Sequence, residues 1–469
     1  MTDISRASKD TINTRWIGWT VWIAATLAMT GVLLWPAFWN GFPLIFPDTG
    51  GYLLRPLEGT LGYGRSAFYG AFLAAGMPLD FWPNIVVQAL VTVFLIRTLV
   101  KANDLDDGSN LVLVITLALA ALSSLPWYVS QLMPDVLVGW AVIALYLLTF
   151  RRDALGPFEM ATLIAIVACA MASHMAILAL SLGLFACVLL MRIVAPRIGL
   201  LRPRLAAPAL AVATGILLCP VSTYLVTGKF AFTPGGSTFI FGRLVQDGLV
   251  QRYLDDHCPD KTVKLCRYEN DVPDTADEWL WTGTTPLYKL GGWKGFRPEA
   301  ERLIVATLRL YPYQHVRTAL EAALDQFLMF RTQLSVKPGV NIHVVATFGE
   351  QLSAGANARF LAARQQRDKP DIAILNVLHV PIAAVSLSVI AFIAVFNQPK
   401  WTDTAMRALC ATVLLALIGN AVICGVLSNP NDRYQNRLIW LAVLAAALVA
   451  AQWRRARTAT AGKQDALKA

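Results

Sequence analysis

The feature that most constrains this chain is a series of apolar stretches, each long enough to cross a lipid bilayer. A helix needs about 20 apolar residues to span the hydrocarbon core. Stretches of this kind occur at 16–36, 81–100, 110–127, 134–150, 158–174, 175–192, 205–227, 372–396, 406–427 and 436–453. Charged residues make up only 15% of the chain, against about 25% in a typical soluble protein. We therefore predict an all-α polytopic membrane protein with about ten transmembrane helices.

Two details of this count need an argument. The first stretch follows a polar, basic segment, is too long for a signal-peptide core and lacks a small-residue cleavage site, so we expect a retained helix. Residues 158–192 form one hydrophobic block long enough for two spans, and we divide it at Ser173 and His174, its most polar point. The segment 66–79 is too short to cross and is expected to be a re-entrant or interfacial helix.

Basic residues predict the orientation, because Lys and Arg are enriched in cytoplasmic loops. Five groups of them follow or separate the spans: Arg97 and Lys101; Arg151 and Arg152; Arg192, Arg197, Arg202 and Arg204; Lys400 and Arg407; Arg454, Arg455 and Arg457. An even number of spans places all five groups on the side of the N-terminus. We predict an inner (cytoplasmic) membrane protein with both termini in the cytoplasm. This rule also accounts for the net charge of +10 without nucleic-acid binding.

The same count sends four segments to the extracytoplasmic side: 37–80, 128–133, 228–371 and 428–435. Only 228–371 is long and polar, and its part 299–330 has a helix-like pattern. We expect a small α-rich extracytoplasmic domain there. It would separate an N-terminal transmembrane module, 1–227, which includes the first outer loop 37–80, from a C-terminal module, 372–469.

The cysteines fall into two groups. Those in apolar stretches are expected to be inert: Cys169, Cys187, Cys219, Cys410 and Cys424. Cys258 and Cys266 lie in the long outer segment, where a disulfide is expected and two free thiols are the alternative. No Cys or His spacing typical of a zinc site occurs.

The first polar motif lies just outside the first span and reads Phe46-Pro47-Asp48-Thr49-Gly50-Gly51-Tyr52-Leu53. Gly50 and Gly51 allow the backbone to approach a ligand closely. Asp48 at a membrane boundary can have a raised pKa and act as a base. The alternative is that Asp48 caps an interfacial helix.

Two further motifs carry charge to the same face. Asp135 follows Pro134 at the start of the fourth span, where ordinary helix-start chemistry is the alternative to function. Arg433 and Arg437, one turn apart, lie where the chain enters the last span, and they suit phosphate oxygens. Their alternative role is as snorkelling anchors.

Smaller signals accompany these motifs. Arg55 and Arg65 lie on the outer side against the charge rule. His174 could touch a substrate or be a satisfied interfacial histidine. Three tryptophans of the outer segment could stack on sugars or pack a domain core: Trp279, Trp281 and Trp293.

The pattern resembles the GT-C superfamily of integral-membrane glycosyltransferases, in particular the bacterial relatives of the protein mannosyltransferases and the lipid A aminoarabinose transferase. Members show a "PDSxxYL"-like stretch in the first outer loop, matched by Pro47–Leu53 and followed here by Arg65–Tyr69. They also carry an acidic residue in the second outer loop, matched by Asp135, and a late Arg-Tyr pair, matched by Arg433-Tyr434. The similarity is clearest over residues 16–200, and 228–371 has no counterpart.

The resemblance implies transfer of a sugar from a polyprenyl-phosphate donor to a glycan, lipid or protein hydroxyl on the outer face, with inversion. Asp48 would be the base and Asp135 the second catalytic carboxylate. The substrate- and phosphate-binding residues would be Tyr52, Arg55, Arg65, His174, Arg433, Tyr434 and Arg437. The family often has Glu where this chain has Asp135, and no second acidic residue stands beside Asp48. A divalent metal cation, held by Asp48 and Asp135, therefore stays an open question.

Two other functions remain as alternatives. A transporter or flippase of a lipid-linked glycan would need ionisable residues or broken helices near the middle of the bilayer. A non-catalytic envelope assembly protein would use the outer domain to bind a partner. The spans show few features of the kind that a transporter needs, and the polar residues crowd one end.

Overall fold

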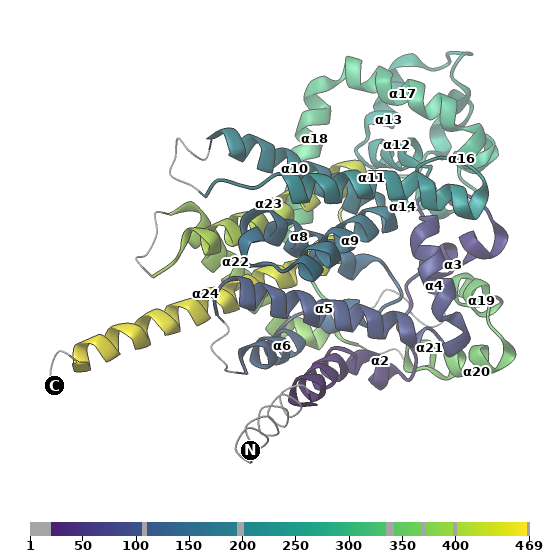
Figure 1. Cartoon of the computed structure of the whole chain (residues 1–469). Coiled ribbons are helices and arrows are strands. Elements are labelled where there is room, and N and C mark those ends of the chain that lie inside the picture. The colour runs from purple at the N-terminus through teal and green to yellow at the C-terminus, as the bar shows by residue number, and fades with distance from the viewer. Residues whose placement is uncertain are drawn as a thin grey trace.

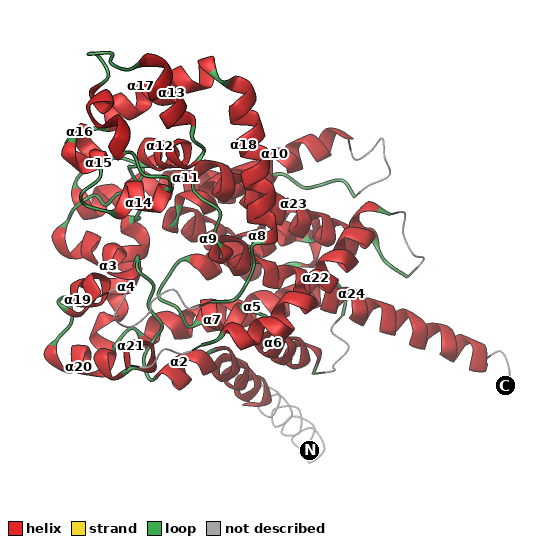
Figure 2. Ribbon diagram, turned by 180° about the vertical axis from the view of Figure 1, so that it is seen from behind, coloured by secondary structure: helices red, strands yellow, loops and turns green. Residues whose placement is uncertain are grey.

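The computed structural model describes residues 20–105, 110–194, 201–333, 342–367, 371–396 and 401–466. Throughout these residues the regular structure is helical (Figure 2). Extended pairing in them is limited to two isolated bridges, Leu44 with Gln131 and Gly62 with Arg65. The predicted all-α class is confirmed for this part of the chain.

Within the described residues, six helical stretches are long and apolar enough to cross a membrane. They are α5 (Trp82–Ala102), α10 (Met175–Val194), α11 (Ala206–Thr227), Ala373–Val395 including α22 (Asn376–Val395), α23 (Thr404–Leu427) and Asp432–Thr460 of α24 (Asp432–Ala466). The other predicted spans correspond to shorter apolar helices: Thr20–Leu33, α6 (Leu111–Leu122), α8 (Asp135–Phe150) and α9 (Pro157–Ser173).

One predicted span ends earlier than expected. The stretch 110–127 was predicted as a single helix, but α6 ends at Leu122 because Ser123 adopts an extended conformation. A new short helix, α7 (Leu125–Val129), then begins with Pro126 in its first turn. Proline is favoured in this position because its missing N–H is not needed there.

The helices run between two ends of the bundle. One, which we call the arginine end, carries Arg97 and Arg151 near the C-terminal ends of α5 and α8, Arg204 beside them, Arg407 in the first turn of α23 and Arg454 in the C-terminal half of α24. The other, the site end, carries Asp135 and Arg433 in the first turns of α8 and α24, and Asp48, which pairs with Arg433. Figure 1 shows these helices packed side by side. At the arginine end, Tyr146 Oη of α8 donates to the carbonyl oxygen of Ala405 in α23 at 3.0 Å. There too, Arg407 Nε of α23 donates to the carbonyl oxygen of Ala394 in α22 at 3.1 Å. The last turns of α8 and α22 therefore meet the first turn of α23.

The helix break at His174 falls where the sequence predicted it. Its backbone is extended, with φ −158° and ψ 133°, between the end of α9 and the start of α10. Glu159 in the first turn of α9 pairs with Lys101 at 2.7 Å. Arg192 in the last turn of α10 donates to the carbonyl oxygen of Pro203 at 3.0 Å. Both contacts lie at the arginine end, so the chain reverses its direction at His174.

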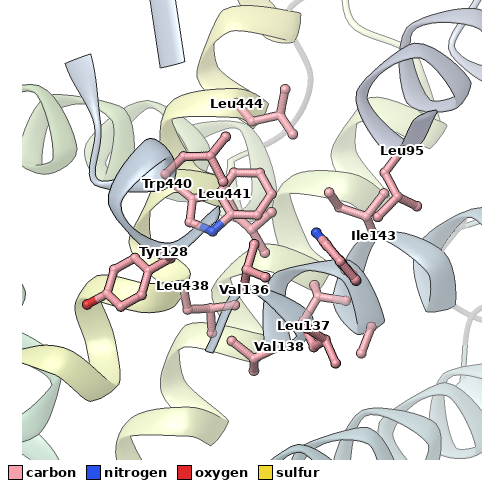
Figure 3. Packing of buried hydrophobic residues seen from close by; sticks show 14 of the residues in the cluster. Leu95, Tyr128, Val136, Leu137, Val138, Ile143, Leu438, Trp440, Leu441 and Leu444 are labelled. Carbon is pink, nitrogen blue, oxygen red and sulfur yellow. The ribbon is translucent and has the colours of Figure 1, made fainter. Parts of the chain in front are cut away.

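The main core lies between α8 and its neighbours, which include α5, α9, α23 and α24. Side chains of α8 and α24 pack together in Figure 3, among them Val136 and Leu441. A Cβ atom at Gly139 would lie 2.4 Å from the Trp440 ring, so only glycine allows this approach. Burial of this apolar surface stabilises the contact between the two helices that carry the charged motifs.

The first outer loop forms three short helices and a 3₁₀ turn: α2 (Trp35–Asn40), α3 (Thr49–Glu58), α4 (Ala67–Gly76) and η1 (Met77–Leu79). The last two cover the segment 66–79, which was expected to be a short helix. A Cβ atom at Gly70 would lie 2.3 Å from the carbonyl oxygen of Tyr52. This close contact holds α4 against α3 and orients the residues that precede each helix.

A helical lobe lies over the site end. It contains α12 (Gly236–Gln246), α13 (Leu249–His257), η4 (Lys264–Asp271), α14 (Ala276–Trp281), α15 (Pro286–Lys289), α16 (Gly292–Gly295), α17 (Arg297–Leu310) and α18 (Pro312–Leu328). The lobe has its own core around Phe241, Trp279 and Phe296. A disulfide joins Cys258 and Cys266, with their Cα atoms 5.5 Å apart.

The rest of the predicted outer domain packs elsewhere. It forms α19 (Ile342–Gly349), α20 (Ala354–Ala362) and α21 (Arg364–Arg367), and the turn η5 (Ala373–Leu375) follows it, before α22. Phe348 and Phe360 join the main core and contact Phe81 and Phe42. Gln365 Nε2 donates to the carbonyl oxygen of Ile45 at 2.9 Å. This segment therefore supports the first outer loop, whereas the lobe is a separate apolar cluster.

Candidate functional site

Asp48 stands immediately before α3, but its side chain makes no capping hydrogen bond. The turn is held instead by Thr49 Oγ1, which accepts the Phe46 N–H at 2.9 Å and donates to the carbonyl oxygen of Leu132 at 3.1 Å. This second bond ties the first outer loop to the segment before α8. The Asp48 carboxylate is left to contact Arg65 and Arg433. Helix capping, the alternative role for Asp48, is excluded by this geometry.

Asp135, the first residue of α8, is completely buried. One of its oxygens accepts from Arg433 Nη2 at 2.8 Å, and the other accepts from Arg437 Nη1 at 3.0 Å. Its side chain makes a two-sided ion pair and is not a simple helix-start carboxylate. A buried carboxylate of this kind is stable as an anion only because both cations face it.

The two arginines lie on one face of α24, as their four-residue spacing requires. Arg433 also donates from Nη1 to Asp48 Oδ2 at 3.3 Å, and its guanidinium lies 3.8 Å from the Phe46 ring centroid. Arg437 is 1% exposed and its Nη2 donates to Asn420 Oδ1 at 3.3 Å. Both side chains are buried in the bundle, which excludes their alternative role as snorkelling anchors.

These residues form what we call the charge cluster: Asp48, Arg65, Asp135, Arg433 and Arg437. With three guanidinium groups and two carboxylates, it carries one excess positive charge. The side chains become more exposed from Asp135 at 0% to Arg65 at 15% and Asp48 at 25%. The cluster is therefore buried where it meets α8, and solvent reaches it at Asp48 and Arg65.

The Asp48 carboxylate is ionised more easily than the sequence suggested. Burial raises its pKa, but the positive charges of Arg65 and Arg433 outweigh burial and hold the pKa below its ordinary value of 3.8. The expectation that the pKa of Asp48 is raised is wrong. It considered the effect of the low dielectric but not that of the two nearby guanidinium groups. At neutral pH the carboxylate is an anion that can accept a proton.

A layer of aromatic and amide side chains surrounds the charge cluster. Tyr52 is buried, and the Arg65 guanidinium lies 6.0 Å from its ring centroid. Tyr69 Oη donates to Gln88 Oε1 at 3.1 Å, and Gln88 Nε2 donates to the carbonyl oxygens of Val129 and Gln131. Sequence analysis missed Gln88, although a glutamine within an apolar span is a detectable signal.

Of three further predicted site residues, Arg55 and His174 have other contacts and Tyr434 adjoins the cluster. Arg55 donates to the carbonyl oxygen of Gly51 at 3.0 Å and to Thr60, on its own helix and turn. His174 Nδ1 accepts the N–H of Ala176 at 3.1 Å and caps α10. Tyr434 lies beside the cluster, with the Arg437 guanidinium 5.3 Å from its ring centroid.

The donor set does not suit a divalent cation. Among the described residues, no group of three or more His, Cys, Asp and Glu side chains is placed to hold a metal ion. Asp48 and Asp135 both face guanidinium groups, which repel a cation. The arrangement favours an anionic ligand.

Comparisons of the chain with protein families, with curated proteins and with solved structures found no match.

Proposed function

We propose that this protein is an integral-membrane glycosyltransferase that moves a sugar from a polyprenyl-phosphate donor to an acceptor hydroxyl. The observation that carries the proposal is the charge cluster, in which a partly exposed carboxylate, Asp48, lies against two guanidinium groups. A base beside a phosphate-binding pair is the minimum that this chemistry needs.

The proposed topology has ten helices crossing the membrane, with the site end on the extracytoplasmic face. The alternating direction of the helices and the basic residues at the arginine end support it. The shorter helix α6 is continued at the site end by α7, as Thr20–Leu33 is by α2. Six of the ten proposed spans already meet the length requirement within the described residues.

The excess positive charge favours a phosphate group at the open side of the cluster. Arginine suits this role because its planar fork can donate two parallel hydrogen bonds to phosphate oxygens. Arg65 and Arg433 flank Asp48, so a phosphate held by them would lie next to the base. The net charge of the occupied cluster would then be close to neutral.

An apolar hollow at the site end suits the lipid part of such a donor. It lies between the helices near α7 and is lined by Val32, Trp35, Leu117, Ala120, Ala121, Trp127, Leu375 and His379. Near it, Ser124 Oγ at the start of α7 donates to the carbonyl oxygen of Asn436 at 2.9 Å, which ties α7 to the turn of α24 that carries Arg437. A polyprenyl chain in this hollow would hold its phosphate at the site end, at the same depth in the membrane as Arg65 and Arg433.

In the proposed reaction, the acceptor oxygen forms a bond to the anomeric carbon as the bond from that carbon to the phosphate oxygen breaks. The hydroxyl proton passes to Asp48, and the electron pair leaves with the phosphate. Arg65 and Arg433 stabilise the charge that develops on the leaving group. When Arg65 turns to the phosphate, it weakens its hold on Asp48 and makes that carboxylate a stronger base. Asp135 positions Arg433 and Arg437 and does not touch the substrates.

The test is sugar transfer by the purified protein in nanodiscs. The donors would be radiolabelled polyprenyl-phosphate mannose, glucose and aminoarabinose, each offered with lipid and oligosaccharide acceptors. Asp48→Asn should lower turnover by about 100-fold or more, as loss of a general base does. The matched control is Asp80→Asn, which alters another outer carboxylate, paired with Arg359 away from the cluster. Equal turnover by wild type and Asp48→Asn would remove Asp48 as the base. Movement of an unaltered donor across liposome membranes without transfer would favour a transporter instead.

A further inference from the structure

Four aromatic rings gather above the open side of the charge cluster. The Trp281 and Trp293 ring centroids are 5.6 Å apart, and Tyr63 stacks on Trp293 at 5.1 Å. Phe239 meets Trp293 edge-on at 5.1 Å. We call these four residues the aromatic shelf. Tyr63 comes from the first outer loop and the other three come from the lobe, so the shelf joins two distant parts of the chain.

Glycines press the backbone against these rings. Gly64 has φ +69°, and a Cβ atom there would lie 3.0 Å from the Phe239 ring. Gly235 has φ +114°, and its Cβ would lie 3.4 Å from Trp293 and Tyr63. The Gly64 N–H donates to the carbonyl oxygen of Pro234 at 3.0 Å. Both glycines adopt backbone conformations that other residues rarely do, so the rings are held in fixed positions.

The shelf lies directly beside the base. Arg65 follows Gly64, contacts Asp48 and places its guanidinium 5.7 Å from the Trp281 ring centroid. A single guanidinium therefore separates the Trp281 ring from the Asp48 carboxylate. The shelf and the charge cluster share this arginine.

Core packing does not explain Trp281. Trp279, two residues earlier, is fully buried in the lobe, whereas Trp281 is 51% exposed. A large exposed ring next to a charged pair is typical of a binding site. One face of the ring is available to a ligand, while the neighbouring side chains hold the ring in place. The suggestion that the tryptophans pack the lobe core thus holds for Trp279 and fails for Trp281.

We propose that the aromatic shelf binds the apolar face of a sugar ring belonging to the acceptor. The acceptor would then be a saccharide. Its role as acceptor rests on the proposed transferase function. The C–H face of a pyranose stacks on an aromatic ring, while its hydroxyls at the edge can bond to carboxylate and guanidinium groups. A ring stacked on Trp281 would present a hydroxyl toward Asp48.

An aromatic belt at lipid headgroups is the competing explanation for exposed tryptophans. The apolar surface of the lobe that suits lipid lies on α18, where Val316, Leu320 and Leu324 are each at least 60% exposed. In Figure 1, α18 runs along the side of the bundle near α10 and α23, while α14 and α16 lie near α3. The shelf is thus on the part of the lobe that faces the first outer loop.

The experiment measures saccharide binding to the purified protein in nanodiscs by saturation-transfer NMR. The probes are maltotriose, α-mannotriose and chitotriose. At least one should bind wild type with a Kd in the millimolar range, and Trp281→Ala should weaken it about three- to tenfold, the range expected for one aromatic contact. Trp281→Phe should retain most of the affinity. Trp453→Ala, which removes an exposed tryptophan at the arginine end, should leave it unchanged.

Three outcomes overturn the shelf proposal. One is that none of the three saccharides binds at concentrations of tens of millimolar. Another is that Trp281→Ala binds them as wild type does. The third concerns the fluorescence of Trp281, taken as the difference between the emission of wild type and that of Trp281→Phe. If lipids with brominated acyl chains quench this fluorescence, the Trp281 ring lies in the bilayer. Asp48→Asn separates the two proposals, because it should abolish transfer and retain saccharide binding. Binding without any transfer by wild type would refute the transferase and leave the shelf as a saccharide site.

Discussion

Arg437 of α24 donates to Asp135 of α8 at 3.0 Å, and both side chains are almost completely removed from solvent. This ion pair fixes how the two helices lie against each other, because Asp135 is also held by Arg433 Nη2 at 2.8 Å, on the same face of α24. It also makes the bundle sensitive to the loss of either member, since the remaining charge would be buried without compensation. The charge cluster therefore has a structural part around Asp135 and an accessible part around Asp48.

Replacing Asp135 should destabilise the protein more than replacing Asp48. Asp135→Asn leaves Arg433 and Arg437 facing a neutral group, at a cost of about 3–5 kcal/mol for a broken buried pair. Asp48→Asn should cost much less, because Asp48 is partly exposed. The measurement is thermal unfolding of the purified protein in detergent. Equal melting temperatures for the two variants would contradict the division of the cluster.

Arg65 should set the pH at which Asp48 loses its charge. The Asp48 pKa lies below 3.8 in the folded protein, so the stabilisation from its ion pairs is present at neutral pH and is lost as the pH falls through that lowered pKa. Arg65→Gln removes one of the two cations and should shift the acid limb of the transfer rate to higher pH. Arg55→Gln, on the same loop but bonded to Gly51 and Thr60, is the control. An unchanged acid limb in Arg65→Gln would show that Arg65 does not act on the base.

Filling the apolar hollow should weaken use of the donor. Ala121→Trp places a large ring in the space beside Trp127 and His379, and should raise KM for the polyprenyl donor several-fold with little change in kcat. Val114→Trp changes an exposed position on the same helix outside the hollow and should have no effect. If both variants raise KM equally, the hollow is not the place where the lipid chain binds.

The outer face of α18 should lie in the outer leaflet. Leu320 is 67% exposed, on a helix packed so closely on α23 that a Cβ at Gly425 would lie 2.5 Å from the carbonyl oxygen of Ala322. Glu321 is also exposed but pairs with Arg317 at 2.8 Å on the neighbouring ridge. In intact cells, a membrane-impermeant maleimide should label Glu321→Cys and spare Leu320→Cys, relative to unsubstituted protein. Equal labelling would show that the whole helix is in water.

Much of the charge cluster could be predicted from the sequence, because counting spans is enough to place Asp48, Asp135, Arg433 and Arg437 on one face. The count depended on the helix break at His174, which polarity alone located. The distinction between Arg55 and Arg65 could not be predicted. Both lie in the same loop with the same side chain, and only the packing of the Gly62–Gly64 turn against the lobe directs Arg65 to Asp48.

Other parts of the fold depend on contacts that leave no local pattern. Phe348 packs on Phe81 and beside Gly50, which places α19 against the first outer loop, although more than half of the chain separates Phe81 from Phe348. The sequence left an anchor role open for Arg433 for the same reason. An arginine at a helix start has the same sequence signature whether it faces lipid headgroups or a carboxylate 298 residues earlier.

That separation between Asp135 and Arg433 has a consequence for biogenesis. At synthesis rates of about 5–20 residues per second, α8 emerges roughly 15–60 s before the helix that carries its counter-charges. During this interval the Asp135 carboxylate has neither guanidinium, so it must be protonated, hydrated or shielded by the insertion machinery. The bundle can close only when α24 arrives, and a chain truncated before residue 432 would expose an unpaired acid to the membrane quality-control proteases.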